Sequence, residues 1–258
     1  MKLKFFPAIA AILLLLAAAC SPREAGDLNY SWQPVPITAS LDAGTNDAAL
    51  EAISQYDTLL APLQEIIGYS EDVYLSKRPE SGLSNFAADV VRECAEKVIG
   101  ETVHVGITNF GGIRTGLPKG AVRVYDIYSI FPFNNYIEVV DVEGSVLRKT
   151  IESMVANHSV PAVSGVCIVA DDTTLVSCMV AGAPIDDSKT YKLATTDFLL
   201  NGGDSLFTRE IAKNQYQTGI VMRDMYVDYI KEMTAAGRKI DLRPDGRVVI
   251  ENFKKIKE

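Results

Sequence analysis

The stretch Asn109-Phe110-Gly111-Gly112-Ile113-Arg114 directly follows an apolar, strand-like run over residues 103–108. A second stretch, Asp197-Phe198-Leu199-Leu200-Asn201-Gly202-Gly203-Asp204, follows a similar run over residues 191–196. A pair of glycines lets backbone amides come close to a bound molecule, because no Cβ stands in the way. The donors of Arg114 suit a carboxylate or phosphate, and the acceptors of Asp204 suit sugar hydroxyls or ring N–H groups. One such pair alone is an ordinary turn, whereas two in matched positions indicate a polar ligand site.

Around these two stretches, helical and strand-like patterns alternate without a strict βαβ rhythm. This pattern predicts an α/β chain of the α+β type, in which mixed β-sheets and flanking helices form layers. Helices are predicted at 47–67 (closed by Gly68 and kinked or divided at Pro62), 81–99, 125–130 (one turn), 146–156 (with Ser145 as N-cap) and 219–236. Strands are predicted at 69–75, 103–108, 121–124, 136–142, 191–196 and 248–250, with a hairpin over 166–180.

The N-terminus has the features of an export signal. Two lysines precede a short apolar run and three alanines, which lead into Cys20. This pattern predicts a signal peptide over residues 1–19 and a bacterial lipid anchor on Cys20, with cleavage at an ordinary site nearby as the alternative. The polar residues 20–46 are predicted to be a tether, although Trp32 and Pro34-Val35-Pro36 would also suit a short edge strand. The folded domain is expected over 47–258, held at the periplasmic face or cell surface by the lipid alone.

Charge and cysteine content limit the classes of function. The formal net charge of −8 offers no basic surface for a nucleic-acid polymer. Cys94 lies in an apolar helical run and is predicted to be in the core. Cys167 and Cys178 lie equally far from the centre of the predicted hairpin, so that a disulfide and two buried thiols both remain open.

Five motifs follow one another in order between about residue 47 and the end. They are Glu80-Ser81-Gly82-Leu83-Ser84-Asn85-Phe86, the two glycine stretches quoted above, Phe131-Pro132-Phe133-Asn134-Asn135 with the following strand and Gly144, and Val163-Ser164-Gly165-Val166. Together with the terminal Asp245-Gly246-Arg247-Val248, these motifs resemble the C-terminal domain of the 5'-nucleotidase family. In that family a two-metal phosphatase domain comes first, and the second domain binds the nucleoside.

The resemblance implies a substrate-binding site. Phe133 and Phe198 match two aromatic residues that hold the base between them, where each stacking contact is worth about 1–3 kcal/mol. Asp204 matches an acid near the nucleoside. Asn109 and Arg114 match residues that contact the phosphate end, and Gly111 and Gly112 match glycines whose backbone comes close to the ligand. The family has arginines just before the motif at residue 80. Arg78 and Lys77 are the nearest candidates for that position here, and Pro79 disturbs the register.

Each of these roles has an alternative. Phe133 and Phe198 would also suit plain core packing. Arg114 would suit a surface salt bridge, and Asp204 would suit a turn cap. Phe110 stands where the family often has a third glycine, so that its bulk is expected to narrow or reshape the pocket.

The family's metal motifs are not found in this sequence. Hydrolysis in the family needs a dinuclear metal centre with several His, Asp and Asn ligands, whereas this sequence has two histidines, His104 and His158, both expected to be structural. We therefore expect no metal, no cofactor and no catalytic residue here, and a separate metallophosphatase chain as partner. Two alternatives remain: a surface-tethered nucleoside-binding protein for salvage, and a structural relic with a collapsed pocket.

Overall fold

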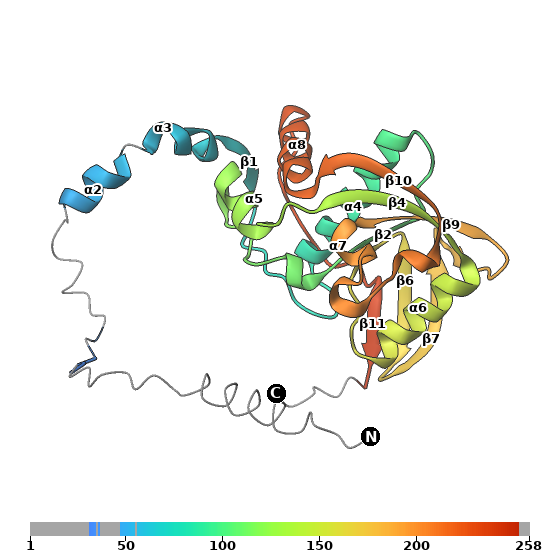
Figure 1. Cartoon of the computed structure of the whole chain (residues 1–258). Coiled ribbons are helices and arrows are strands. Elements are labelled where there is room, and N and C mark those ends of the chain that lie inside the picture. The colour runs from blue at the N-terminus through green and yellow to red at the C-terminus, as the bar shows by residue number, and fades with distance from the viewer. Residues whose placement is uncertain (1–30, 35, 37–46, 55, 253–258) are drawn as a thin grey trace, which may run out of the picture. The chain divides into compact units, whose positions relative to one another are not determined.

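The computed structural model describes residues 31–34, 36, 47–54 and 56–252 (Figure 1). The predicted signal peptide, Cys20 and most of the predicted tether lie outside the described residues. Residues 31–34 and 36 form no strand, so the suggested edge strand at Trp32 is not found. Helix α2 (Asp47–Ser54) belongs to a unit that ends at Ser54, and the larger unit begins at Gln55.

A five-stranded mixed sheet forms the centre of the larger unit, as predicted. The spatial order is β10 (Ala212–Val221), β4 (Tyr136–Glu143), β9 (Thr190–Thr196), β2 (Val105–Thr108) and β5 (Ala162–Ser164). Strands β2 and β9 pair in parallel, and the other neighbouring strands are antiparallel.

Both faces of this sheet are covered by apolar side chains. Alternate side chains of a strand point to opposite faces, so neighbouring residues of one strand belong to different core clusters. Ile137 and Val139 of β4 belong to the core cluster that contains helices α4 (Gly82–Ile99), α5 (Val124–Ile130) and α8 (Met222–Ala235). Val140 and Val142 belong to a second cluster, with helix α6 (Gly144–Ala156) and a four-stranded sheet. That sheet has the order β11 (Val248–Glu251), β6 (Val166–Asp171), β7 (Thr174–Val180) and β8 (Ala183–Pro184).

The N-terminal part of the larger unit differs from the prediction. The helix predicted over 47–67 is found in pieces, as α2, α3 (Asp57–Leu60) and the 3₁₀ turn η2 (Ala61–Gln64). Its last residues belong instead to strand β1 (Ile66–Ser70), which also takes the first two residues of the strand predicted over 69–75. Strand β1 pairs with β3 (Gly120–Arg123), which buries Ile67. The apolar residues near Gly68 therefore reflect strand pairing with a distant segment rather than a helical face.

Other boundaries also shift. Strand β10 occupies the first residues of the helix predicted over 219–236, so α8 begins at Met222. The cap of α6 is Glu143 rather than Ser145. The helix predicted over 81–99 is confirmed, and Ser81 and Ser84 form a reciprocal capping box at its start.

The predicted hairpin is confirmed, but its two cysteines do not face each other. An irregularity in the β6–β7 register places Cys167 opposite Met179 and Cys178 opposite Ile168. Cys167 is exposed, Cys178 is buried, and both are free thiols, so neither the disulfide nor the pair of buried thiols is correct.

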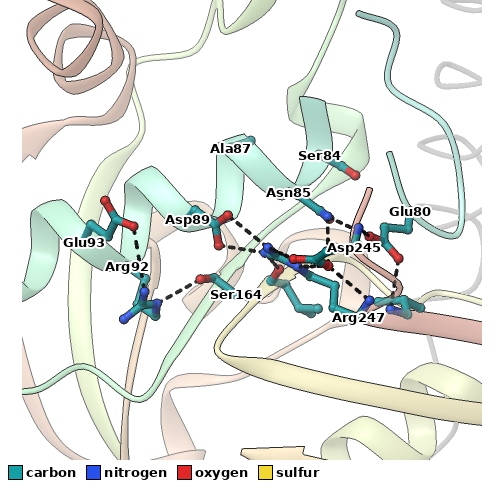
Figure 2. Close-up of polar contacts among 12 residues, drawn as sticks. Glu80, Ser84, Asn85, Ala87, Asp89, Arg92, Glu93, Ser164, Asp245 and Arg247 are labelled. Atoms are coloured by element: carbon teal, nitrogen blue, oxygen red, sulfur yellow. Dashed lines mark hydrogen bonds and ion pairs between the residues drawn. The ribbon is translucent and has the colours of Figure 1, made fainter. Parts of the chain in front are cut away.

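A polar cluster ties the C-terminal strand to helix α4. Figure 2 shows Arg247 between the carboxylates of Asp89 and Asp245, with Nη1 2.7 Å from Asp89 Oδ1 and Nη2 2.7 Å from Asp245 Oδ2. Glu80 accepts hydrogen bonds from the backbone N–H groups of Asp245 and Val248, and from the side chain of Asn85. The motifs at 80–86 and 245–248 therefore join two distant segments of the chain.

Candidate functional site: a pocket between two glycine loops

The two glycine stretches meet because β2 and β9 are parallel neighbours in the sheet. The carboxyl ends of both strands lie at the same edge, so the loops that follow them come together. Asn109, directly after β2, donates a hydrogen bond from Nδ2 to Oδ2 of Asp204 over 2.6 Å. Residues that lie far apart in the sequence thereby form one rim.

A cavity of about 260 Å³ lies at this junction. Seven of the eight predicted substrate-binding residues line it, and Arg78 is the exception. The lining residues are Asn109, Gly111, Gly112, Arg114, Phe133, Asn135, Phe198 and Asp204. The cavity combines two aromatic rings with amide, carboxylate and guanidinium groups, a composition typical of a site for a flat polar ligand.

The two phenylalanines are exposed rather than packed in the core. Phe133 is 44% exposed and Phe198 is 42% exposed, which is unusual for a residue type that is commonly buried. Plain core packing, the alternative considered from the sequence, therefore does not describe either ring. Both are available at the cavity wall for contact with a ligand.

The second glycine pair holds Phe198 in place. Phe198 lies on the short helix α7 (Asp197–Leu200), which Thr196 caps by accepting a hydrogen bond from the backbone N–H of Leu199. A Cβ built on Gly203 would clash with the Phe198 ring. Gly203 is therefore needed for the close contact between the backbone and this ring.

Asp204 and Gly202 adopt left-handed backbone conformations, with φ of +52° and +92°. This conformation is uncommon for a residue other than glycine. Strain of this kind is found where a loop must aim a side chain. Here it accompanies the contact between the Asp204 carboxylate and Asn109, and Asp204 does not act as the turn cap considered from the sequence.

The first glycine pair makes room for the Asn109 side chain. A Cβ on Gly112 would lie 2.7 Å from Asn109 Oδ1. That oxygen is buried and has no hydrogen-bond partner within the described part of the chain. Arg114 donates from Nη1 to the carbonyl oxygen of Gly111 over 3.1 Å. Among the described residues, Arg114 forms no ion pair within 4.0 Å, so the surface salt bridge considered from the sequence is not present.

Arg78 lies beside the first loop rather than in the cavity wall. Its guanidinium carbon is 4.4 Å from the centroid of the Phe110 ring, and Nη1 donates to the carbonyl oxygen of Val160 over 2.7 Å. Burial lowers the pKa of Arg78 below its ordinary value, although the negative charge of Asp204 acts in the opposite direction. Phe110 does not line the cavity, so the expected narrowing of the pocket by its bulk is not observed.

Two features of the site were missed from the sequence. Asn135 lines the cavity, and its place in the Phe131–Asn135 motif was the available signal. Behind helix α7, Arg209 donates from Nη1 and Nη2 to the buried carboxylate of Glu138 at 2.8 and 2.9 Å, and from Nε to Asn201 over 2.7 Å. No sequence pattern indicated this clamp, because its members lie on β4, after α7 and before β10.

The two histidines lie apart from the cavity. His104 accepts a hydrogen bond from the backbone N–H of Lys192, and burial together with the Lys192 charge lowers the pKa of His104. His158 Nε2 lies 3.7 Å from Asp172 Oδ1. Within the described residues, no group of three or more His, Cys, Asp or Glu side chains is arranged to hold a metal ion. No helix in this part combines the length and apolarity needed to cross a membrane.

Most of the larger unit is similar in sequence to known proteins. Residues 66–209 match the family model described as 5'-nucleotidase, C-terminal domain. The trifunctional nucleotide phosphoesterase protein YfkN of Bacillus subtilis (strain 168) is 26% identical over 226 residues, covering 79% of this chain and 15% of that protein. The cell wall protein Lmo0130 of Listeria monocytogenes is 25% identical over 259 residues, covering 90% of this chain and 32% of that protein.

A similar fold is found in the crystal structure of a 5'-nucleotidase precursor from Thermus thermophilus. The TM-score is 0.69 at 24% identity, with 81% of this chain and 44% of that chain covered. The chain therefore spans less than half the length of each of these three relatives.

Proposed function

Because this chain belongs to the family of 5'-nucleotidase C-terminal domains, we propose that it is the nucleoside- or nucleotide-binding half of a nucleotide phosphohydrolase system in nucleotide catabolism. The observation that carries the proposal is the cavity, in which Phe133, Phe198 and Asp204 come together. A base enters between the two rings, and the polar groups of the rim orient the sugar and phosphate.

We further propose that a separate metallophosphatase chain supplies the hydrolytic chemistry. Contacts to the nucleoside, which lies away from the reacting phosphate, position that phosphate and contribute to the rate. This arrangement works across two chains when they dock near the glycine loops. The chain itself is exported, in keeping with the description of the relative Lmo0130 as a cell wall protein, and it is held by a lipid on Cys20.

Binding is tested on the full chain purified in detergent, by titration with adenosine and with AMP. Phe133→Ala and Phe198→Ala each lower the affinity for adenosine about tenfold, since a base–aromatic stack is worth about 1–3 kcal/mol. Tyr125→Ala, which removes an exposed aromatic ring on α5, is the control and leaves the affinity unchanged. Unchanged binding in both phenylalanine variants contradicts the stacking roles.

The two-chain arrangement is tested by adding a metallophosphatase-domain protein and following the hydrolysis of AMP. The proposal expects a higher kcat/KM in the mixture than with the phosphatase alone. The gain should fall when Phe198→Ala replaces the unsubstituted chain. A mixture with no gain contradicts the split enzyme.

A second candidate is a surface-tethered protein that binds nucleosides for salvage without a role in hydrolysis. The observation in its favour is that this chain by itself already forms a cavity of about 260 Å³ with both phenylalanines and Asp204 in its wall. Calorimetry on the chain alone separates the two functions. Tight binding of adenosine without any partner supports the salvage function, whereas binding that is too weak to give measurable heat but is still seen by ligand-observed NMR supports the split enzyme.

A further inference from the structure

The guanidinium of Arg78 packs on the aromatic ring of Phe110, close to the edge of the cavity. The guanidinium carbon of Arg78 lies 4.4 Å from the centroid of the Phe110 ring, within the range of a cation–π contact. A second contact, from Nη1 to the carbonyl oxygen of Val160, anchors one end of the guanidinium. A ring contact and a hydrogen bond together restrict where this group can lie.

Most donors of this guanidinium remain available to a ligand. An arginine has five N–H donors, and the bond to Val160 is the one that Arg78 makes within the described part of the chain. Among the same residues, no carboxylate lies within 4.0 Å of Arg78. The cation therefore has no ion-pair partner among the described residues, and its planar fork suits an anionic oxygen group.

Phe110 belongs to the loop that forms part of the cavity wall. Phe110 lies between Asn109 and Gly111, which both line the cavity. Burial lowers the pKa of Arg78, and the charge of Asp204, across the rim, opposes that shift. The side chain held by Phe110 is therefore close to the place where a nucleotide would lie.

We infer that Phe110 is a positioning residue that holds Arg78 ready for the phosphate of a nucleotide bound in the cavity. The inference rests on the proposed function. An aromatic ring is required, because the attraction arises from the negative face of the ring and not from its bulk. Leucine at this position would keep the apolar bulk and lose the attraction, whereas tyrosine would keep both.

The test compares the affinities for AMP and adenosine, measured by ligand-observed NMR so that weak binding is detected. The proteins are the unsubstituted chain, Phe110→Leu, Phe110→Tyr, Arg78→Ala and the double variant Phe110→Leu/Arg78→Ala. We expect the ratio of AMP affinity to adenosine affinity to fall about fivefold in Phe110→Leu, from a cation–π contact of typical strength. Phe110→Tyr should keep the ratio, and Phe110→Leu should have no further effect once Arg78 is absent.

Thermal unfolding of each variant shows whether it is folded. An unchanged ratio in folded Phe110→Leu overturns the inference, and so does an equal fall in the Arg78→Ala background, which would show an effect independent of the guanidinium. Failure of the unsubstituted chain to bind either ligand is a different result, because it contradicts nucleotide binding itself.

Discussion

Asn109 Nδ2 lies 2.6 Å from Asp204 Oδ2, and this hydrogen bond joins the two loops that form the pocket. Asn109 is 6% exposed, and its other polar atom, Oδ1, has no partner among the described residues. The amide thus uses its donor to hold Asp204, whose backbone is in the left-handed region. The shape of the pocket depends on this contact.

Asn109→Asp should separate the loops at neutral pH. The substitution places a carboxylate against the carboxylate of Asp204 and leaves a buried charged oxygen without a donor, which costs about 1–3 kcal/mol. Like charges raise the pKa of one carboxyl in the folded state, so the loss of stability is greatest at pH 7 and shrinks as the pH falls toward 4. Thermal unfolding between pH 4 and 8 measures this dependence.

Asn214→Asp is the matched control, because Asn214 Nδ2 donates to Asp141 Oδ2 over 2.8 Å in an exposed pair beside Lys192. We expect a smaller loss of stability and no change in nucleotide affinity for this variant. An equal loss in both variants would show that the Asn109–Asp204 contact has no special role.

Gly203→Ala should destabilise the protein by moving Phe198. The added methyl group would clash with the ring, and overpacking of this kind costs about 1–3 kcal/mol. In the double variant Gly203→Ala/Phe198→Ala the ring is absent, so the alanine at 203 should cost less than it does alone. Urea unfolding of the four proteins gives this coupling, and additive effects would contradict the contact.

The glycine loops, the two phenylalanines and Asp204 could be located from the sequence because their motifs are local. Each motif follows an apolar strand, and its residue types already suit a ligand site. By contrast, the β1–β3 pairing and the Glu138–Arg209 contact each join segments that are far apart in the sequence. No local pattern in these segments identifies the segment with which each one pairs. The sequence suggested that Cys167 and Cys178 could face each other across the hairpin. They do not, because an irregularity in the pairing of β6 with β7 shifts the register of the two strands by one residue.

Strand β10 was missed for a different reason. Its residues 213–217 are exposed and mostly polar, and the strand pairs with β4 alone at the edge of the sheet. An apolar alternation arises only when one face of a strand is buried. Without that alternation, residues 212–218 had no predicted element, and residues 219–221 were assigned to the following helix.

The Arg247 cluster should make stability depend on pH through Asp245. Hydrogen bonds from Arg247 are the main cause of a lowered pKa of Asp245. A carboxyl group with a lowered folded-state pKa stabilises the protein above its unfolded pKa of about 4, and this contribution is lost as the pH falls through the folded pKa. Asp245→Asn should therefore destabilise the protein by about 1 kcal/mol at pH 7, with the difference from the unsubstituted chain narrowing below pH 4.

Asp241→Asn is the matched control for this experiment. Asp241 pairs with Arg243 at the same spacing of two residues, but the side chain of Arg243 is 81% exposed whereas that of Arg247 is 14% exposed. Solvent weakens an exposed pair, so Asp241→Asn should change the unfolding temperature little. Equal pH profiles for the two variants would contradict a structural role for the Arg247 cluster.

The three cysteines after Cys20 should differ sharply in reactivity. Burial raises the pKa of Cys94 and of Cys178 to about 11, so at pH 8 about one in a thousand of either thiol is ionised. Cys167 is exposed on the hairpin. Ellman's reagent at pH 8 should therefore label one thiol quickly and the other two slowly, and Cys167→Ser should remove the fast phase. Cys94→Ser should retain that phase, because it removes a slow thiol. An unfolding temperature that fell on addition of a reductant would show a disulfide and contradict the register of β6 and β7.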